Sequence, residues 1–454
     1  MNSTLAGLRA ELPPMAKLAT PVVVAELGWI AMGVVDIAMV GRLGPEAIGA
    51  VGVGSVLFFA VAVFGVGVLL GLDTLVSQAY GARRLEECHR WLFHGGWLSV
   101  LLAVPLTGVT AVVIGTLDRW GLDPAVEQLA APYLSIILWS ILPLLLYTAF
   151  RRYLQAMGSG SPVMLALVSA NLINIAANWL LVFGNLGAPR LGVDGAAWAT
   201  CVSRVYLALF LLFAILRHDR HQRTGLWQAP RRLDLDRLRR LTVLGLPAAV
   251  QVTLEVGVFA VATALAGRLA PATLAAHQIV LSVAGVTFMV PLGVGAAGAV
   301  RVGHAVGRRD PTGATDAGWA ALVLGTGFMA CSGLVFVLAP QPILRLFTAE
   351  PTVVSIGVPL LFVAALFQLF DGLQGVATGV LRGLGDTRTP MLWNLAGHWA
   401  LGLPMGYLLC FEQGWGALGL WVGLCIGLVV VGTVLVFIWF RRTAEWPPDA
   451  RERP

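Results

Sequence analysis

Several acidic side chains lie inside apolar runs of this sequence. A charged carboxylate there has an unfavourable free energy, so these residues are candidates for a function. Glu255 lies midway between Arg240 and Arg268, Asp371 follows the run GVPLLFVAALFQLF, and Asp36 interrupts WIAMGVVDIAMVG. One charged side chain near the centre of a membrane helix costs roughly 2.5–3.5 kcal/mol on insertion scales. Each of these carboxylates therefore predicts a site for a cation or a proton, with a hydrogen bond to a neighbouring helix as the alternative.

Two further acids, Glu26 and Asp73, lie in the first and second apolar runs. For them a place near a span end, or a hydrogen bond to a neighbouring helix, is the better interpretation.

Three asparagines, Asn171, Asn174 and Asn178, share one face of a helix because they are spaced by three and four residues. Such a stripe serves either helix packing or ligand binding. Carboxylate, amide and hydroxyl oxygens are the ligands that hard cations prefer, and the same carboxylate can take a proton instead. The residues therefore predict sodium or a proton as the bound ion, with Glu255, Asp371 or Asp36 as its ligand.

The elements that carry these residues must cross a membrane. The 454 residues are 58% hydrophobic and 12% charged, with a mean hydropathy of +0.82, whereas soluble domains are roughly 25% charged. The five cysteines show no CxxC pair or metal-ligand spacing and are expected to be reduced packing residues. No cofactor is expected. We predict an all-α integral membrane protein with twelve transmembrane helices near residues 18–40, 47–79, 92–115, 128–150, 162–184, 194–216, 241–266, 273–305, 317–340, 352–381, 389–411 and 416–440.

Basic residues gather on one side of the predicted membrane. Most of the 30 lysines and arginines fall in alternate connections, and the densest cluster lies at residues 217–240. By the positive-inside rule both termini are predicted to be cytoplasmic. The same asymmetry explains the sequence pI of 9.4 without any nucleic-acid partner.

An internal repeat divides the chain. The segment Gly41–Ala50 recurs as Gly267–Ala276 with half of its positions identical. Each half holds an even number of predicted spans, so the halves enter the membrane from the same side, as in transporters built from parallel repeats. We predict an N-lobe of six transmembrane helices at residues 1–216, a cytoplasmic basic linker at 217–240, and a C-lobe of six transmembrane helices with a short basic tail at 241–454.

Four segments in order along nearly the whole chain resemble the MATE (multidrug and toxic compound extrusion) family, and its NorM-type bacterial exporters in particular. They are TPVVVAELGWIAMGVVDIAMVGRLG, GLPAAVQVTLEVGVF, LAAHQI and LRGLGDTRTP. The resemblance implies two six-helix bundles around a central cleft in the bacterial inner membrane, working as a monomer and not as an enzyme. It implies antiport of lipophilic organic cations and drugs against inward sodium or protons by alternating access.

The resemblance also assigns site residues by position. An N-lobe cation site would comprise Asp36, Asn174, Asn178 and Thr200, and a C-lobe cation site would comprise Glu255 and Asp371. Two positions depart from the family pattern: Phe367 stands where NorM-type exporters often have tyrosine, and Glu26 replaces a more usual neutral polar residue. Both are expected to line the substrate cleft, where an aromatic ring can face an organic cation.

Other functions fit the sequence less well. A major-facilitator transporter usually carries a loop resembling GxLaDrxGrr after its second span, and the corresponding loop here reads SQAYGARRLEE. A lipid-linked sugar flippase need not carry these membrane carboxylates, and a membrane scaffold gives no reason for them. The string Gly383-Leu-Gly-Asp386 is found in intramembrane aspartyl proteases, but it lies beside Arg382 and Arg388 in a predicted cytoplasmic connection.

Overall fold

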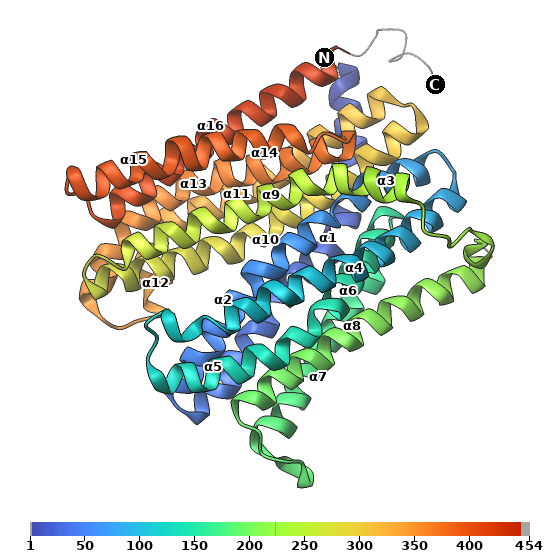
Figure 1. Ribbon diagram of the computed structural model, residues 1–454. Coiled ribbons are helices and arrows are strands. Elements are labelled where there is room, and N and C mark those ends of the chain that lie inside the picture. The colour runs from blue at the N-terminus through green and yellow to red at the C-terminus, as the bar shows by residue number, and fades with distance from the viewer. Residues whose placement is uncertain (1, 223, 446–454) are drawn as a thin grey trace. The chain divides into compact units, whose positions relative to one another are not determined.

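The computed structural model describes residues 2–222 and 224–445 and arranges them as helices joined by short connections (Figure 1). The helices of the first part of the chain are α1 (Asn2–Val40), α2 (Pro45–Val68), α3 (Gly71–Gly81), α4 (Leu85–Ile114), α5 (Pro124–Ile137), α6 (Ile141–Ala156), α7 (Ser161–Phe183) and α8 (Val193–Gln222). Those of the second part are α9 (Leu235–Ala266), α10 (Pro271–Arg308), α11 (Pro311–Leu338), α12 (Pro340–Arg345), α13 (Pro351–Leu384), α14 (Arg388–Asn394), α15 (Leu403–Tyr407) and α16 (Ala417–Ala444). Short 3-10 helices are η1 (Gly41–Leu43), η2 (Leu117–Arg119), η3 (Leu138–Ser140), η4 (Asn185–Gly187) and η5 (Leu226–Gln228), and the π-helices are η6 (Leu395–Gly402) and η7 (Leu408–Glu412).

Eleven helical segments of the described residues are long and apolar enough to cross a membrane. The remaining predicted span, at residues 389–411, is a run of short pieces formed by α14, η6, α15 and η7. Because its helical pitch changes to π-type twice, no single regular helix covers it. The prediction of an all-α membrane protein is confirmed.

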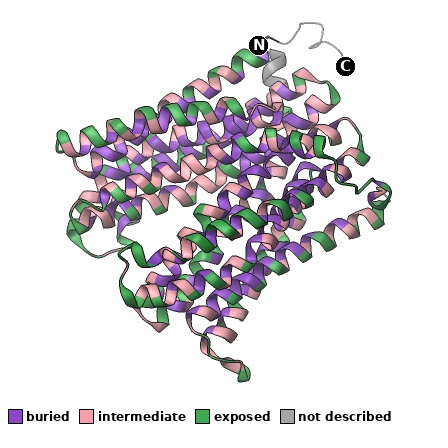
Figure 2. Cartoon of the chain, in the orientation of Figure 1, coloured by how far each residue is buried: buried purple, intermediate pink, exposed green. Residues whose placement is uncertain are grey.

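Exposed residues recur along these helices (green in Figure 2), and many of them are large and apolar. Val104 on α4 is 73% exposed, Phe213 on α8 is 61% exposed and Phe440 on α16 is 56% exposed. In water, apolar faces of this extent would drive aggregation, whereas lipid tails are a compatible solvent for them. The burial pattern therefore agrees with helices that face lipid on one side and protein on the other.

Helix α1 begins well before the predicted span at residue 18. The polar stretch that precedes the apolar run is amphipathic, and its apolar side packs into protein: Met15 and Ala19 are buried in one cluster with Val302 and Ala305 of α10. A helix of this length needs tertiary packing of one face to be stable. Packing, which hydropathy does not report, extends α1 toward the N-terminus.

The described chain forms two compact units. We call Val24–Ala249 the N-unit, and Met1–Val23 together with Val250–Pro454 the C-unit. The chain therefore changes unit inside two helices, α1 and α9. Both changes follow closely after a proline, Pro21 and Pro247, and these two prolines are as far apart as Gly41 and Gly267 of the repeat. The change from one unit to the other therefore falls at equivalent positions of the two sequence repeats.

The start of α1, up to Val23, lies in the C-unit, and the start of α9, up to Ala249, lies in the N-unit. We call these the exchanged segments, and close backbone contacts hold each of them in its unit. A Cβ at Gly245 of α9 would lie 1.9 Å from the carbonyl oxygen of Val68 in the N-unit. A Cβ at Gly293 of α10 would lie 2.6 Å from the side chain of Val23 in the C-unit. Small residues allow helices to approach this closely in a membrane, where packing is a main source of stability.

Candidate functional site

The carboxyl group of Asp36 is the centre of a polar cluster in the N-unit. Its Oδ1 accepts hydrogen bonds from Nδ2 of Asn174 at 3.0 Å and Nδ2 of Asn178 at 2.7 Å, and its Oδ2 accepts one from Oγ1 of Thr200 at 2.7 Å. The four side chains are buried and come from α1, α7 and α8. The structure therefore brings together all four residues expected in the N-lobe cation site, and their binding of a cation stays a prediction.

The asparagine stripe of α7 serves two purposes. Asn174 and Asn178 are one turn apart and both reach Asp36, but Asn171 donates to the backbone carbonyls of Gly28 and Leu167. Asn171 therefore fastens α7 to α1. The Oδ1 atoms of Asn174 and Asn178 are buried and have no hydrogen-bond partner among the described residues. Unsatisfied amide oxygens beside a carboxylate are ligands that a hard cation accepts.

Arg204 of α8 lies next to this cluster and was given no role from the sequence. Its Nη1 donates to Oγ of Ser140 at 2.6 Å, and its guanidinium carbon lies 4.4 Å from the ring centre of Phe58 and 5.9 Å from that of Trp29. The residue is 8% exposed. An arginine in the middle of an otherwise apolar span is itself a signal that sequence reasoning can use.

Glu26 and Asp73 are held by consecutive arginines of α6. Arg151 donates from Nη2 to Oε1 of Glu26, and Arg152 donates from Nη1 to Oδ2 of Asp73 at 3.4 Å. Both pairs are buried. Bonding to a neighbouring helix, the better interpretation for both acids, is what the structure shows. A place for Glu26 in a substrate cleft stays a prediction.

Glu255 and Asp371 are acids of the C-unit that interact electrostatically with each other. Glu255 of α9 interacts with the side chains of Gln251 and Gln374, and Asp371 of α13 interacts electrostatically with Glu255. Asp371 is 5% exposed and Glu255 is half-buried. No ion pair found among the described residues involves either carboxyl group. The two residues expected in the C-lobe cation site are therefore near enough to interact electrostatically, and neither has a basic partner in an ion pair among the described residues.

A histidine extends this C-unit cluster. Nε2 of Gln374 donates to Oδ1 of Asn394 at 3.2 Å, and Oε1 of Gln374 lies 3.2 Å from Nε2 of His398. Because the amide oxygen can only accept, His398 carries its proton on Nε2 in this arrangement. His398 lies in the π-helix η6, a type of helix that is frequent at functional sites. Sequence reasoning missed it because hydropathy does not reveal the π-helical turn that presents the ring.

Phe367 lies in the apolar core of the C-unit. Its ring contacts those of Phe259 and Trp421 edge-on, with centres 6.1 and 5.4 Å apart, and the residue is 2% exposed. The aromatic packing accounts for a ring at this position. Contact with a substrate stays a prediction.

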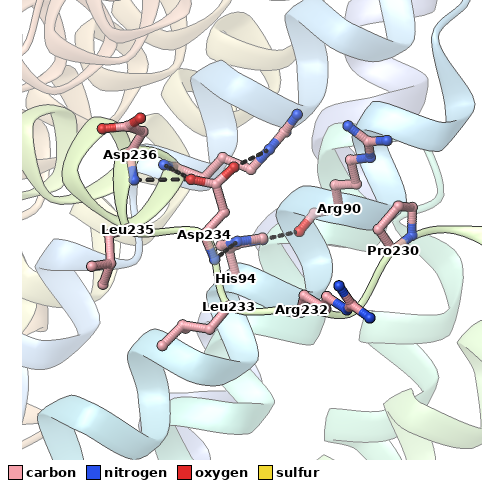
Figure 3. Close-up of a pocket in the computed structure, with 9 residues that line it drawn as sticks. Arg90, His94, Pro230, Arg232, Leu233, Asp234, Leu235 and Asp236 are labelled. Atoms are coloured by element: carbon pink, nitrogen blue, oxygen red, sulfur yellow. Dashed lines mark hydrogen bonds and ion pairs between the residues drawn. The ribbon is translucent and has the colours of Figure 1, made fainter.

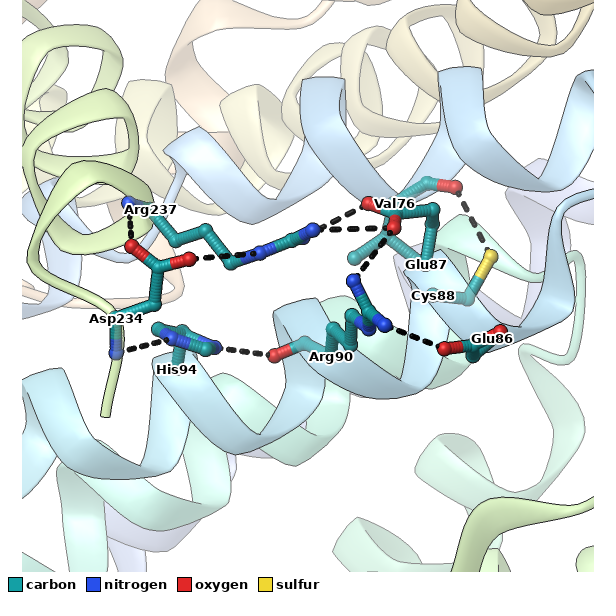
Figure 4. A network of polar contacts seen from close by, with 8 residues as sticks. All are labelled: Val76, Glu86, Glu87, Cys88, Arg90, His94, Asp234 and Arg237. Atoms are coloured by element: carbon teal, nitrogen blue, oxygen red, sulfur yellow. Dashed lines mark hydrogen bonds and ion pairs between the residues drawn. The ribbon is translucent and has the colours of Figure 1, made fainter. Parts of the chain in front are cut away.

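A surface pocket of about 520 Å³ lies where the linker meets α4 and the start of α9 (Figure 3). The charged side chains that line it are largely paired with one another or with their neighbours (Figure 4): Arg237 pairs with Glu87 at 2.8 Å and Arg90 with Glu86 at 2.6 Å. The backbone N–H of Asp234 donates to Nε2 of His94, so the Nδ1 proton of His94 is free to bond the carbonyl of Arg90. The network fastens the linker to α4.

Comparisons with known proteins agree with this architecture. The MatE family profile matches residues 21–180 and 247–408, two stretches that follow the internal repeat. The "Probable multidrug resistance protein NorM" of Mesorhizobium japonicum is 37% identical over 449 residues, which are 97% of this chain and 96% of that protein. The "Multidrug resistance protein NorM" of Burkholderia vietnamiensis is 37% identical over 95% of this chain and 94% of that protein.

Among solved structures, the crystal structure of the eukaryotic MATE transporter AtDTX14 superposes with a TM-score of 0.87 at 25% identity, over 98% of this chain and 99% of that one. Family profile, full-length relatives and fold therefore point the same way. The chain belongs to the MatE family of multi-pass membrane transporters, which are not enzymes.

Proposed function

We propose that the protein is a secondary active exporter that moves lipophilic organic cations and drugs out of the cell against an inward flow of sodium ions or protons. The observation that carries the proposal is the pair of C-unit acids, Glu255 and Asp371, which interact electrostatically and have no basic partner in an ion pair among the described residues. Two carboxylates that interact in a low dielectric do not both stay ionised without a bound cation, and in its absence one of them takes a proton.

The antiport has a physical basis if the ion and the cationic drug use the same pair of carboxylates. An ion that enters from outside neutralises the pair and removes the attraction that holds a cationic drug, and loss of that ion to the cytoplasm restores it. One positive charge that moves inward through 100 mV supplies about 2.3 kcal/mol, which is enough for roughly a fiftyfold gradient of a neutral drug. Export of a singly charged drug uses the same energy, so its exchange for one ion is driven by the concentration gradient of that ion. The NorM-type relatives are named as multidrug resistance proteins, which supports drugs as the exported class.

The same proposal includes the surroundings of the protein. Basic residues concentrate in alternate connections, which supports cytoplasmic termini, and bacterial relatives support the inner membrane. The two halves, related by the internal repeat, support alternating access in a working monomer. Asp36, which accepts hydrogen bonds from three side chains in the N-unit, is the other candidate residue for binding the coupling ion.

Vesicles that contain the purified protein and a fluorescent cationic dye test the function. An inward sodium gradient and an inward proton gradient are applied separately, and one of them is expected to drive dye efflux. Glu255→Gln and Asp371→Asn are expected to abolish that efflux. Glu412→Gln, which changes an exposed acid at the end of η7, is the matched control and should transport normally.

Equal efflux from the two C-unit variants and the wild type would contradict the assignment of the carboxyl pair. Absence of efflux under either gradient, with folded protein in the vesicles, would contradict the antiport of cationic dyes and favour a flippase.

A further inference from the structure

A second surface pocket of the N-unit, of about 550 Å³, lies between α3 and the start of α9. The transport scheme gives it no role. We call it the α3/α9 groove, and the residues that line it are Leu75 of α3 and Asp236, Arg239, Arg240, Val243 and Leu244 of α9. Along α9 the charged residues of the groove come first and the apolar ones follow, so the groove is polar at one end and apolar at the other.

Close packing of α3 and its preceding turn against α9 holds the groove in shape. A Cβ at Gly71 would lie 2.9 Å from the carbonyl oxygen of Leu241, and a Cβ at Gly245 would lie 1.9 Å from that of Val68. The two backbones therefore touch directly beside the groove. A site whose walls are already in place does not have to be ordered when a ligand binds, which favours affinity.

Arg239 and Arg240 are the cationic groups of the groove, and both are exposed. No hydrogen bond or ion pair found among the described residues engages either guanidinium group, whereas Arg237, two residues earlier, pairs with Glu87 at 2.8 Å. Asp236 is the acid that lines the groove, so two positive charges stand against one negative charge. Unpaired guanidinium groups in excess favour an anion, and phosphate oxygens fit their N–H donors in pairs.

The apolar end of the groove begins one helical turn farther along α9. Val243 follows Arg239 by four residues and Leu244 follows Arg240 by four, so each apolar side chain neighbours an arginine on the same face of the helix. A helix rises 1.5 Å per residue, which separates the two ends of the groove by about 6 Å. Val243 is 47% exposed, and Leu75 faces it from α3 as a half-buried side chain.

The change from charged to apolar residues also sets the depth of the groove in a membrane. Arg240 directly precedes the run of α9 that is apolar enough to span a bilayer and that ends at Ala266. The hydrocarbon core takes about 20 helical residues, so most of this run lies within it and the two arginines lie at its surface. A phospholipid has the same arrangement, with its phosphate at the surface and its acyl chains inside. A soluble anion would match only the arginines.

The surroundings of the groove favour a lipid with a net negative charge. The ion pair of Glu87 with Arg237 places the connection from α3 to α4 beside the start of α9. That connection carries Arg83 and Arg84, which are exposed and take part in no ion pair found among the described residues. The ammonium group of a zwitterionic headgroup would be repelled there. Basic pockets between membrane helices are known binding places of anionic headgroups.

We propose that the α3/α9 groove binds one anionic phospholipid. Its phosphate accepts hydrogen bonds from Arg239 and Arg240, and an acyl chain lies against Leu75 and Val243. The binding requires neither the acids of the C-unit nor a coupling ion, so the proposal goes beyond the antiport and does not depend on it.

Native mass spectrometry of the full-length protein in detergent tests the proposal through the affinity for the first bound lipid. The protein is titrated separately with phosphatidylglycerol, phosphatidylethanolamine and glycerol phosphate. Phosphatidylglycerol is expected to bind several times more tightly than either, because the second is zwitterionic and the third has no acyl chain. Arg239→Gln/Arg240→Gln is expected to weaken phosphatidylglycerol binding about thirtyfold, since each basic residue beside an anionic headgroup contributes about fivefold.

Two control variants separate the site from net charge and from folding. Arg83→Gln/Arg84→Gln removes the same charge from the neighbouring connection and is expected to bind phosphatidylglycerol nearly as the wild type does. Arg239→Lys/Arg240→Lys keeps both charges in the groove and is expected to bind more tightly than the Gln pair does.

Equal affinities of the wild type for phosphatidylglycerol and for either of the other two ligands would overturn the assignment of an anionic lipid. A groove variant with both glutamines that binds like the wild type would overturn the site, and so would an equal loss in the variant of Arg83 and Arg84. A Lys pair that binds as weakly as the Gln pair would overturn the role of charge. None of these results changes the expected dye efflux, which tests the proposed function separately.

Discussion

At the scale of single residues, the acids of this protein differ in what balances their charge. Glu26 and Asp73 are paired with Arg151 and Arg152, Asp36 has three hydrogen-bond donors, and the C-unit acids have amide neighbours. Removal of one partner of a buried ion pair leaves the other charge uncompensated, which costs far more than the pair itself contributes. The paired acids are therefore expected to govern stability, and the unpaired ones to govern ion binding.

Glu26→Gln tests the structural role of the first pair. Glu26 and Arg151 have side chains that are only 11% and 7% exposed, so the variant leaves a buried arginine without its partner. We expect a loss of about 3–5 kcal/mol in the free energy of unfolding, measured by denaturant unfolding in detergent. Glu86→Gln is the matched control, because Glu86 is 61% exposed in its pair with Arg90 and should change stability by less than about 1 kcal/mol. Equal effects of the two variants would contradict the burial argument.

Residue types predicted much of the site, because acids and amides in apolar spans stand out in a sequence. Asn174 and Asn178 share a helix face by their spacing alone, and family resemblance added Thr200. What the sequence could not show is which partners meet across helices. The pairing of Glu26 with Arg151, the contact of Arg204 with Phe58 and the approach of His398 to Gln374 depend on tertiary packing between distant segments.

At the scale of elements, hydropathy located the spans but not their ends or interruptions. The predicted second span is divided into α2 and α3 near Leu69, and the fourth is divided into α5 and α6 by η3. The start of α9 is set by polar contacts instead. Oδ1 of Asp234 accepts from the backbone N–H groups of Asp236 at 2.9 Å and Arg237 at 3.3 Å, which caps the helix.

The cap makes the start of α9 sensitive to pH. The backbone N–H of Arg237, with that of Asp236 and the charge of the Arg237 guanidinium, holds the pKa of Asp234 below its ordinary 3.8. A carboxyl group with a lowered folded-state pKa stabilises the fold above its ordinary pKa and loses that contribution as the pH falls through the folded value. At neutral pH, Asp234→Ala is therefore expected to speed amide hydrogen exchange at Asp236 and Arg237 relative to the wild type.

The difference between variant and wild type should shrink and disappear as the pH falls through the folded-state pKa of Asp234, which lies below the ordinary 3.8. Asp118→Ala, which removes an acid in the connection between α4 and α5, should leave exchange at the start of α9 unchanged. A difference that persists unchanged at acidic pH would show that the side chain acts by its volume and not by its charge.

At the scale of the whole molecule, the two units exchange the beginnings of two helices. Residues 2–23 of α1 belong to the C-unit, and residues 235–249 of α9 belong to the N-unit. Glu11 pairs with Arg301 at 2.6 Å in the C-unit, and Arg237 pairs with Glu87 at 2.8 Å in the N-unit. The repeat in the sequence predicted two similar halves, but it could not predict the exchange, since the exchanged segments lie within continuous helices.

The exchange predicts that a chain cut in the linker stays assembled. Fragments 1–228 and 229–454, expressed together, are expected to copurify through an affinity tag on one of them, because each carries a segment that packs in the unit formed mainly by the other. Gly245→Leu and Gly293→Leu should reduce copurification at least severalfold, since side chains there would meet Val68 and Val23. Gly96→Leu is the control, because a Cβ at Gly96 meets nothing within 4 Å. Fragments that separate on purification would contradict the expectation that the exchanged segments keep the two fragments bound to each other.

The exchange also imposes an order on biosynthesis. The ribosome makes residues 1–23 first, but the residues against which they pack, in α10 and beyond, are among those made last. At about 5–20 residues per second, the beginning of α1 waits for roughly tens of seconds with its apolar side uncovered. During that interval the nascent N-unit likewise lacks residues 235–249, so neither unit can close until translation has passed the middle of the chain. Slow pairing of distant segments of this kind makes the newly made protein dependent on the membrane, or on a chaperone, to cover those surfaces.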